Sequence, residues 1–396
     1  MSGGSLRALA AVLAVLACLA SFGCSPFGSG DSGSGETASP AEPTFADRGE
    51  ELVSELSPSQ LLGQRILLSF DGTELPALVA DRLRAGLAPG VVLFDRNYAS
   101  AAQLRELTGQ IQSAAAAGPV DLPALVMVDQ EGGDVRRVPG PPELSAEAMG
   151  ETLTAEEIGE QGRLTGGFLA DLGVNTDLAP VADIGSEGGA LADEDRTFSA
   201  EPEAVSGAAK AFADGLHAEG VAATAKHFPG FGSAAVNTDF GTAVIERTPA
   251  DAQREIAPFR GMVDEGVPLV MLSTAIYPEY GASPAALTSA VTQDLLRGEM
   301  GFTGVTVTDA LDTPALAAYA PPADVAVEAL DAPTDLLLYA QSTQASLDAE
   351  VAGEGAIAAG VLGKAELRRA AARILTLRLA LEDTATLGEL VDENSR

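Results

Sequence analysis

The sequence of 396 residues predicts an α/β fold, a single (β/α)8 barrel of the TIM type. Eight short, mostly apolar runs alternate with Ala- and Leu-rich segments that are long enough to form helices. Runs that are apolar on both faces are typical of parallel strands with both faces buried. No repeat of about 20–50 residues divides the chain. Eight such strands joined by helices favour a closed barrel over an open, doubly wound sheet.

The eight expected strands are spaced widely enough to leave room for helices between them. The fourth is the least apolar, because it carries Asn175, Thr176 and Asp177. The expected strands span residues 65–70, 90–94, 124–128, 175–178, 222–226, 269–272, 304–308 and 335–338.

Helices are expected between the strands and after the last of them. After the seventh strand, Pro314, Pro321 and Pro322 interrupt the helical pattern, because proline has no amide N–H to donate. A closing helix is expected at 365–381, before an acidic tail that we expect to be frayed. The expected crossover helices span residues 75–85, 101–116, 155–172, 201–219, 249–265 and 288–297.

The N-terminal segment predicts export. Arg7 precedes an apolar run at 8–20, which is too short to span a membrane and is typical of a secretory signal. Cys24 follows in a sequence that resembles a lipoprotein processing site; Cys18 is the alternative acceptor, and a simple cleaved signal is the other possibility.

These boundaries predict four parts and a location for the protein. We expect a signal peptide at 1–23, a lipidated tether rich in Ser, Gly and Pro at 24–46, the barrel at 47–382 and the acidic tail at 383–396. The protein is then a monomer on the outer side of the cell membrane, facing the cell wall.

The charge balance excludes one class of partner. The chain has 23 Lys and Arg against 57 Asp and Glu, a formal net charge of −34, whereas nucleic-acid binding needs clustered cations. Hydrophobic residues make up 46 % of the chain, which indicates a folded protein rather than a disordered acidic one.

Polar residues follow several expected strands, where the catalytic loops of a (β/α)8 barrel lie. Carboxylates and cations alternate at this rim, and both kinds of group bind sugar hydroxyls. We therefore expect a neutral, hydroxyl-rich ligand. The candidate residues are Asp129 and Arg137 after the third strand, Arg196 after the fourth, Lys226 and His227 at the fifth, and Asp309 after the seventh.

Each candidate also has a purely structural explanation. Asp309 could cap the next helix. Lys226 could bridge loop carboxylates, and Arg196 could form a surface ion pair with Glu194 and Asp195, which precede it. Their joint occurrence at successive strand ends favours a site.

Six ordered segments between residues 61 and 338 resemble glycoside hydrolase family 3, in its single-domain β-N-acetylhexosaminidase branch. They read GVVLFDRN, VDQEGGDVRR, GVNTDLAPVADI, DRTF, KHFPGFG and LLRGEMGFTGVTVTDAL. The resemblance implies a retaining β-glycosidase that releases terminal β-N-acetylglucosaminyl residues, with peptidoglycan fragments as the expected source. It implies that Asp309 is the nucleophile of a covalent glycosyl-enzyme intermediate. It also implies that the sugar is held by Asp129, Arg137, Arg196, Lys226 and His227.

One loop departs from the family pattern. The family has Asp-Ser-His there, and its His protonates the leaving-group oxygen, whereas this chain has Asn237, Thr238 and Asp239. The two histidines of the chain, His217 and His227, lie elsewhere. We therefore expect Asp239 to be the acid/base. An ordinary Asp has a pKa of about 3.9, so we expect an acidic pH optimum and modest activity.

Three alternatives remain open: a sugar-binding lipoprotein with impaired catalysis, a β-glucosidase or β-xylosidase of the same family, and phosphate in place of water as the acceptor. We expect no metal, because the sequence has no HExxH, cysteine ligand set or calcium-loop pattern. We expect no cofactor, because Gly132 and Gly133 lack the context of a dinucleotide-binding turn. The expected partners are the carbohydrate and, through the lipid anchor alone, the membrane.

Overall fold

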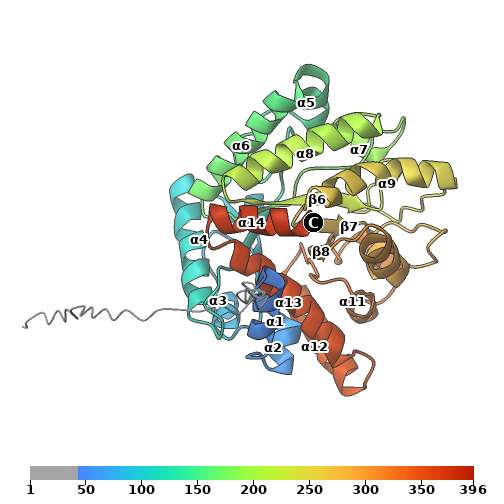
Figure 1. The fold of residues 1–396 in the computed structure, drawn as a ribbon. Helices are drawn as coiled ribbons and strands as arrows, with labels where there is room; N and C mark the ends of the chain where they lie inside the picture. The colour runs from blue at the N-terminus through green and yellow to red at the C-terminus, as the bar shows by residue number, and fades with distance from the viewer. Residues whose placement is uncertain (1–42) are drawn as a thin grey trace, which may run out of the picture. The chain divides into compact units, whose positions relative to one another are not determined.

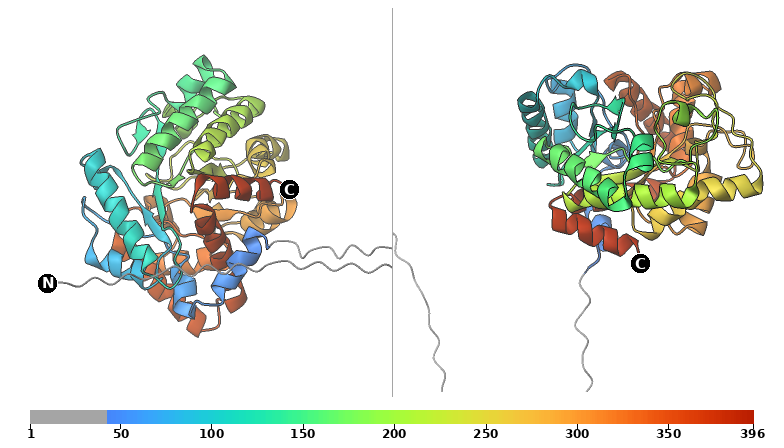
Figure 2. Two further views of the ribbon diagram at one scale, coloured as in Figure 1. Left: turned by 60° about the vertical axis from the view of Figure 1, so that its left-hand side comes forward. Right: turned by 90° about the horizontal axis from the view of Figure 1, so that it is seen from above.

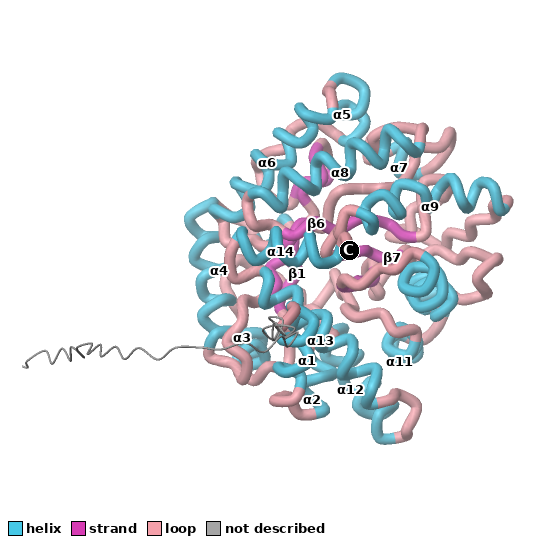
Figure 3. The backbone as a smooth tube through the Cα atoms, in the orientation of Figure 1, coloured by secondary structure: helices cyan, strands magenta, loops and turns pink. Residues whose placement is uncertain are grey.

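Parallel strands form the centre of the computed structural model, which describes residues 43–396. Six strands pair in parallel and in chain order, and Figure 3 shows them in magenta inside a layer of helices. These strands are β1 (Gly90–Val92), β2 (Leu125–Val128), β5 (Thr176–Asp177), β6 (Ala222–Phe228), β7 (Leu269–Leu272) and β8 (Val305–Thr308).

The first and last expected strands close these six into a ring. They pair through single parallel bridges rather than longer ladders: Leu68 with Val91, Ile66 with Leu337, and Leu336 with Val307. All eight expected strand segments therefore take part in the ring, and the predicted (β/α)8 fold is confirmed. A short antiparallel pair, β3 (Gln130–Gly132) and β4 (Val135–Arg136), lies in the loop after β2.

The crossover helices begin and end within two residues of the expected positions. Figures 1 and 2 show α6 and α8 side by side over the sheet. They approach closely because Gly162 has no side chain: a Cβ there would lie 2.2 Å from the carbonyl oxygen of Phe212. The crossover helices are α3 (Ala77–Arg84), α4 (Ala101–Ala116), α6 (Ala155–Asp171), α8 (Pro202–Ala218), α9 (Pro249–Asp264) and the π-helix η3 (Ala290–Glu299).

The prolines after the seventh strand begin helices instead of interrupting one. Pro314 and Pro322 occupy first-turn positions of α10 (Pro314–Tyr319) and α11 (Pro322–Asp331), where an amide N–H has no partner within the helix in any case. The remaining connections contain α5 (Ala146–Thr152), α7 (Ala190–Asp193), η1 (Asp95–Asn97) and η2 (Ala285–Leu287). After the eighth segment follow α12 (Thr343–Ala358) and the expected closing helix α13 (Lys364–Ala380).

The expected frayed tail at 383–396 is wrong. Asp383 caps helix α14 (Thr384–Asn394), and Leu387 and Leu390 on that helix are buried. At the other end, α1 (Phe45–Val53) and α2 (Pro58–Gly63) precede the first segment of the ring, so helix α1 begins two residues before the expected barrel boundary at 47. The predicted signal, Cys24 and most of the tether lie outside the described residues. From 43 to 396, no helix is both long and apolar enough to cross a membrane.

Alternate residues of the strands pack on opposite faces of the sheet, as the two-residue period of a strand requires. Leu125 and Met127 of β2 belong to one buried cluster, which also contains Met271 from the ring interior. Val126 and Val128 belong to a second cluster, between the sheet and the crossover helices.

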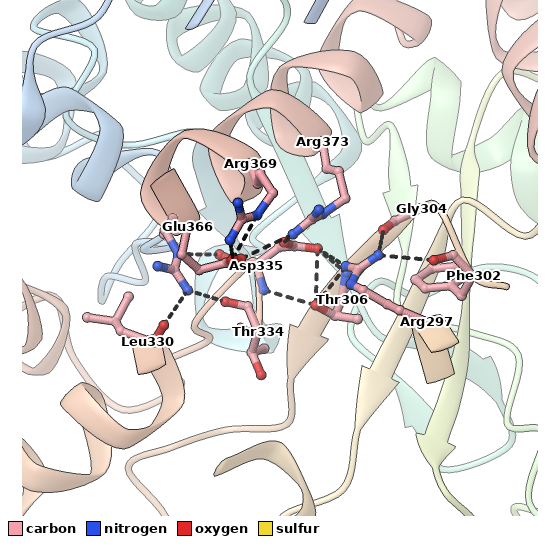
Figure 4. A network of polar contacts seen from close by, with 11 residues as sticks. Arg297, Phe302, Gly304, Thr306, Leu330, Thr334, Asp335, Glu366, Arg369 and Arg373 are labelled. Carbon is pink, nitrogen blue, oxygen red and sulfur yellow. Dashed lines mark hydrogen bonds and ion pairs between the residues drawn. The ribbon is translucent and has the colours of Figure 1, made fainter. Parts of the chain in front are cut away.

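A buried carboxylate joins the elements next to the seam of the ring. Figure 4 shows Asp335 between Arg297 of η3 and Arg373 of α13. One carboxylate oxygen accepts from Arg297 Nη2 at 2.6 Å and from the amide of Thr306 at 2.9 Å. The other accepts from Arg373 Nη2 at 2.7 Å. Nearby, the buried Arg65 guanidinium donates to the carbonyl oxygens of Leu330 and Thr334. These contacts fasten the eighth segment to β8 and α13.

Removing this carboxylate should destabilise the fold. Asp335→Ala leaves Arg297 and Arg373 without their partner in a buried place, so we expect a loss of about 3–5 kcal/mol in the free energy of unfolding. Asp81→Ala, which removes an exposed carboxylate paired with Arg84, should cost about 0–1 kcal/mol. Urea unfolding at pH 7 measures both, and equal midpoints for the two variants would contradict the role of Asp335.

The ion pairs of Asp335 also make the stability of the fold depend on pH in the acid range. Burial alone would raise the pKa of Asp335, but the charges of Arg373 and Arg297 outweigh burial and hold the pKa below its ordinary value. The stabilisation is therefore complete above the pKa of the unfolded carboxyl, about 3.9, and is lost as the pH falls through the lower folded value.

Candidate active site

A cavity of about 490 Å³ opens at the carboxyl ends of the strands. The loops after five of the eight segments contribute charged side chains to its wall. All seven residues expected from the sequence line it: Asp129, Arg137, Arg196, Lys226, His227, Asp239 and Asp309.

Lys226 lies at the floor of the cavity, in β6, with its side chain 1 % exposed. Its Nζ is 2.7 Å from Asp129 Oδ1 and 2.6 Å from Glu131 Oε1. Burial alone would lower the pKa of Lys226, but the charges of Asp129 and Glu131 outweigh it and raise the pKa above its ordinary value. The ammonium group therefore stays charged, with one of its three N–H donors left for a ligand. These contacts agree with the structural explanation of Lys226, in which it bridges loop carboxylates.

Glu131 is a site residue that the sequence interpretation did not single out. Its carboxylate accepts from Arg196 Nη2 at 2.8 Å and from Arg196 Nε at 2.9 Å, in a bidentate pair. Burial would raise the pKa of Glu131, but Arg196 and Lys226 lower it strongly. In the sequence, the only indication of this role was that Gln130 and Glu131 are polar and directly precede the glycines 132 and 133.

The two arginines that the sequence predicted for the site differ in how many of their N–H groups are already hydrogen-bonded. Arg196 also donates from Nη1 to Glu194 at 3.0 Å, so the expected surface pair exists in addition to the buried one with Glu131. Arg137 is only 3.5 Å from Asp129 at its nearest approach and is one-third exposed. Its guanidinium lies 5.6 Å from the ring centre of Phe94. Arg137 is thus the cation with more free N–H groups.

His227 is oriented by a second carboxylate that the sequence interpretation did not identify. Nδ1 of His227 is 2.8 Å from Asp183 Oδ2, and the amide of His227 donates to the same oxygen at 2.8 Å. The other oxygen of Asp183 accepts from the amide of Phe231 at 2.6 Å. With Nδ1 occupied, Nε2 is the nitrogen of His227 left for a ligand in the cavity. In the sequence, the only indication of a role for Asp183 was its place in the segment GVNTDLAPVADI, shortly after the expected fourth strand.

Asp309 directly follows β8, and its position excludes a capping role. Helix α10 begins only at Pro314, and its N-cap residue is Thr313. The amide of Asp309 donates to the carbonyl of Leu272 at 2.9 Å, and Oδ1 accepts from the amide of Ala310 at 2.7 Å. These contacts fix the carboxylate at the cavity wall.

Asp239 reaches the same cavity from the loop between β6 and α9. The residue is exposed at the mouth, yet its pKa is raised, first by partial desolvation and then by the negative charge of Asp309. Arg196 and His227 oppose this shift without cancelling it. Phe231 lines the cavity too. Two carboxyl groups that influence each other therefore face one space.

Comparison with known proteins identifies the family to which this fold and site belong. Residues 67–377 match the family described as the glycosyl hydrolase family 3 N-terminal domain, a range that contains all seven expected residues. The chain belongs to glycoside hydrolase family 3. Family membership and the hydrolases among its relatives confirm the prediction of a glycoside hydrolase.

Several relatives of this family 3 chain carry a named activity. It is 35 % identical to a β-hexosaminidase of Stenotrophomonas maltophilia over 62 % of this chain and 73 % of that protein. It is 34 % identical to a β-hexosaminidase of Nitrosospira multiformis over 71 % of this chain and 81 % of the relative. A secreted glycosyl hydrolase of Arthroderma benhamiae, described as uncharacterised, is 33 % identical over 81 % of this chain and 92 % of its own.

Two solved structures have the same fold. The family 3 β-N-acetylglucosaminidase of Paenibacillus sp. str. FPU-7 has a TM-score of 0.78 and 30 % identity, covering 83 % of this chain but only 64 % of the Paenibacillus chain. A β-N-acetylhexosaminidase from Beutenbergia cavernae has a TM-score of 0.74 and 31 % identity, covering 82 % of this chain and 98 % of the other.

Glu131→Gln tests the charge network of the cavity. Glu131 Oε1 accepts from both Lys226 and Arg196, and Oε2 accepts from Arg196 Nε. A glutamine removes the negative charge and places an N–H against at least one of these donors, so Lys226 and Arg196 lose their fixed positions. We expect kcat/KM for a nitrophenyl glycoside to fall about 10- to 100-fold, the range for losing a hydrogen bond to a charged group.

Glu187→Gln is the matched control, because Glu187 is an exposed carboxylate in the loop that precedes Arg196. Thermal unfolding of both variants separates loss of activity from loss of fold. An unchanged kcat/KM in Glu131→Gln would contradict the network.

Proposed function

We propose that this protein is an exported, retaining β-glycosidase that hydrolyses terminal β-N-acetylglucosaminyl residues through a covalent glycosyl–Asp309 intermediate. The observation that carries the proposal is the pair of carboxyl groups in one cavity, where Asp309 raises the pKa of Asp239. Retaining glycosidases use such a pair, one group as nucleophile and the other as acid/base.

In this mechanism Asp309 attacks the anomeric carbon while the bond from that carbon to the leaving-group oxygen breaks. Asp239 gives its carboxyl proton to that oxygen. The Asp239 carboxylate then takes a proton from a water molecule, whose oxygen displaces Asp309 from the anomeric carbon. The sugar leaves with its configuration retained, and Asp239 is protonated again.

The binding side chains suit a neutral sugar. Lys226 and Arg137 offer N–H donors, Asp129 offers an acceptor and His227 offers its Nε2, while Glu131 and Asp129 balance much of the positive charge. The named activities of the relatives favour N-acetylglucosamine as the donor sugar, and an exported location makes peptidoglycan fragments its source. Equal rates on glucosyl, xylosyl and N-acetylglucosaminyl donors would contradict this choice of sugar. Faster turnover with added phosphate would indicate that phosphate, rather than water, is the acceptor.

Asp239→Asn should affect substrates according to their leaving groups. Hydrolysis of methyl β-N-acetylglucosaminide, which needs a proton on the departing oxygen, should fall about 100-fold or more. For the dinitrophenyl glycoside, kcat/KM should change little, because its leaving group needs no proton, whereas kcat should fall because the second step still needs Asp239 as the base. Because Asp239 acts when protonated, wild-type kcat/KM on the methyl glycoside should fall as the pH rises through the raised pKa, and the variant should lack this fall.

Asp264→Asn, at an exposed position at the end of α9, is the control for removing one carboxylate. Asp309→Ala should abolish the burst of nitrophenol from an activated substrate. A wild-type rate on the methyl glycoside in Asp239→Asn would refute the acid/base assignment.

The replacement of the family's histidine by Asp239 favours a second candidate, a lipoprotein that binds the sugar without cleaving it. A binder has no evident use for the retained nucleophile Asp309, which is why we prefer the enzyme. Binding of N-acetylglucosamine by the wild type with no nitrophenol release would establish the binder.

We also propose that the chain is exported and anchored through a lipid on Cys24, as a monomer. The secreted relative supports export. Cys24→Ser should move the protein from the membrane fraction to the medium, whereas Cys18→Ser should leave it with the membrane. Immunoblotting of the two fractions measures this, and membrane retention of Cys24→Ser would exclude the anchor.

A further inference from the structure

The turn that carries Asp239 is tied to the neighbouring loop by two side chains without a role so far. Asn237 Nδ2 donates to Glu194 Oε1 at 3.0 Å and approaches Oε2 at 3.3 Å. Asn237 Oδ1 accepts from the amide of Asp239 at 3.0 Å. The side-chain amide of Asn237 therefore connects the backbone N–H of Asp239 to the carboxylate of Glu194. We call Glu194 and Asn237 the latch.

Glu194 is itself held from the cavity side. Its Oε2 accepts from Arg196 Nη1 at 3.0 Å, and the opposite edge of the Arg196 guanidinium is fixed by the bidentate pair with Glu131. A continuous series of polar contacts thus runs from the buried Glu131 to the amide of Asp239. All three of Glu194, Asn237 and Asp239 line the cavity.

Apolar packing contributes little to this part of the turn. Phe240 is 78 % exposed and Val236 is 42 % exposed, although Thr238 between them is buried. The amides of Phe240 and Gly241 donate back to the carbonyl of Asn237, so the turn folds around this residue. The position of Asp239 therefore depends on what holds Asn237 as well as on the burial of Thr238.

We propose that Glu194 and Asn237 position Asp239 for proton transfer to the leaving group; this rests on the proposed function of Asp239 as acid/base. Asparagine suits the place because it both donates, to Glu194, and accepts, from Asp239. An aspartate at 237 would have no N–H for Glu194 and would place a second negative charge beside it. Neither latch residue exchanges a proton with the substrate, so both are positioning residues.

Asn237→Ala should therefore slow only the substrates that need the acid. We expect kcat/KM on methyl β-N-acetylglucosaminide to fall about 2- to 10-fold, the range for losing the one hydrogen bond to the amide of Asp239, and kcat/KM on the dinitrophenyl glycoside to stay unchanged. The activity of Asn237→Asp on the methyl glycoside should fall at least as far as that of Asn237→Ala. Glu194→Gln keeps an acceptor for Asn237 and should retain more activity than Glu194→Ala.

The decisive comparison repeats Asn237→Ala in the Asp239→Asn background. If the latch acts through Asp239, the second substitution has no further effect on either substrate. Equal losses of kcat/KM on both substrates, or an undiminished loss in the Asp239→Asn background, would show a general structural role and overturn the proposal. Thermal unfolding of each variant verifies the fold.

The latch and the acid/base assignment fail in different ways. If Asp239→Asn slows the methyl glycoside and Asn237→Ala does not, only the latch is wrong. If Asp239→Asn itself has no effect that depends on the leaving group, the assignment of Asp239 is wrong and the latch falls with it.

Discussion

Closure of the ring is the constraint on which the site depends. The side chains that face the cavity come from loops after separate strands, and they meet only because those strands are arranged around one axis. The seam is the weakest part of this arrangement, since the first and eighth segments pair through single bridges. Asp335 compensates by accepting from the backbone of β8 and from arginines of two helices. The polar network at one end of the barrel thus supports the cavity at the other.

Within the cavity, paired and unpaired carboxylates behave differently. Asp129 and Glu131 face the buried ammonium of Lys226, and their pKa values are lowered although burial opposes this. Asp239 has no such direct cation, and its pKa is raised by desolvation and by Asp309. One site therefore contains carboxylates that stay ionised to hold a ligand and a carboxyl that is shifted towards holding a proton.

The structural and the functional explanations of the candidate residues turn out to be compatible. Lys226 does bridge loop carboxylates, and Arg196 does pair with Glu194. These pairs occupy some of the N–H donors and thereby fix the direction of the others. Only for Asp309 do the contacts exclude the structural explanation, because the next helix has its own N-cap.

The sequence by itself determined the order and period of the strands and helices and the chemical types at the strand ends, because apolar period and residue type are local properties. It therefore predicted the barrel and seven of the residues that line the cavity. It missed Glu131, Asp183 and the latch, because their roles arise from partners 43–65 residues away along the chain, in the pairs Glu194–Asn237, Asp183–His227 and Glu131–Arg196. It also misjudged the C-terminal tail, where burial of Leu387 and Leu390 stabilises a helix that local composition did not favour. Only the tertiary structure decided which charges are paired, since pairing depends on distances that the closed ring alone sets.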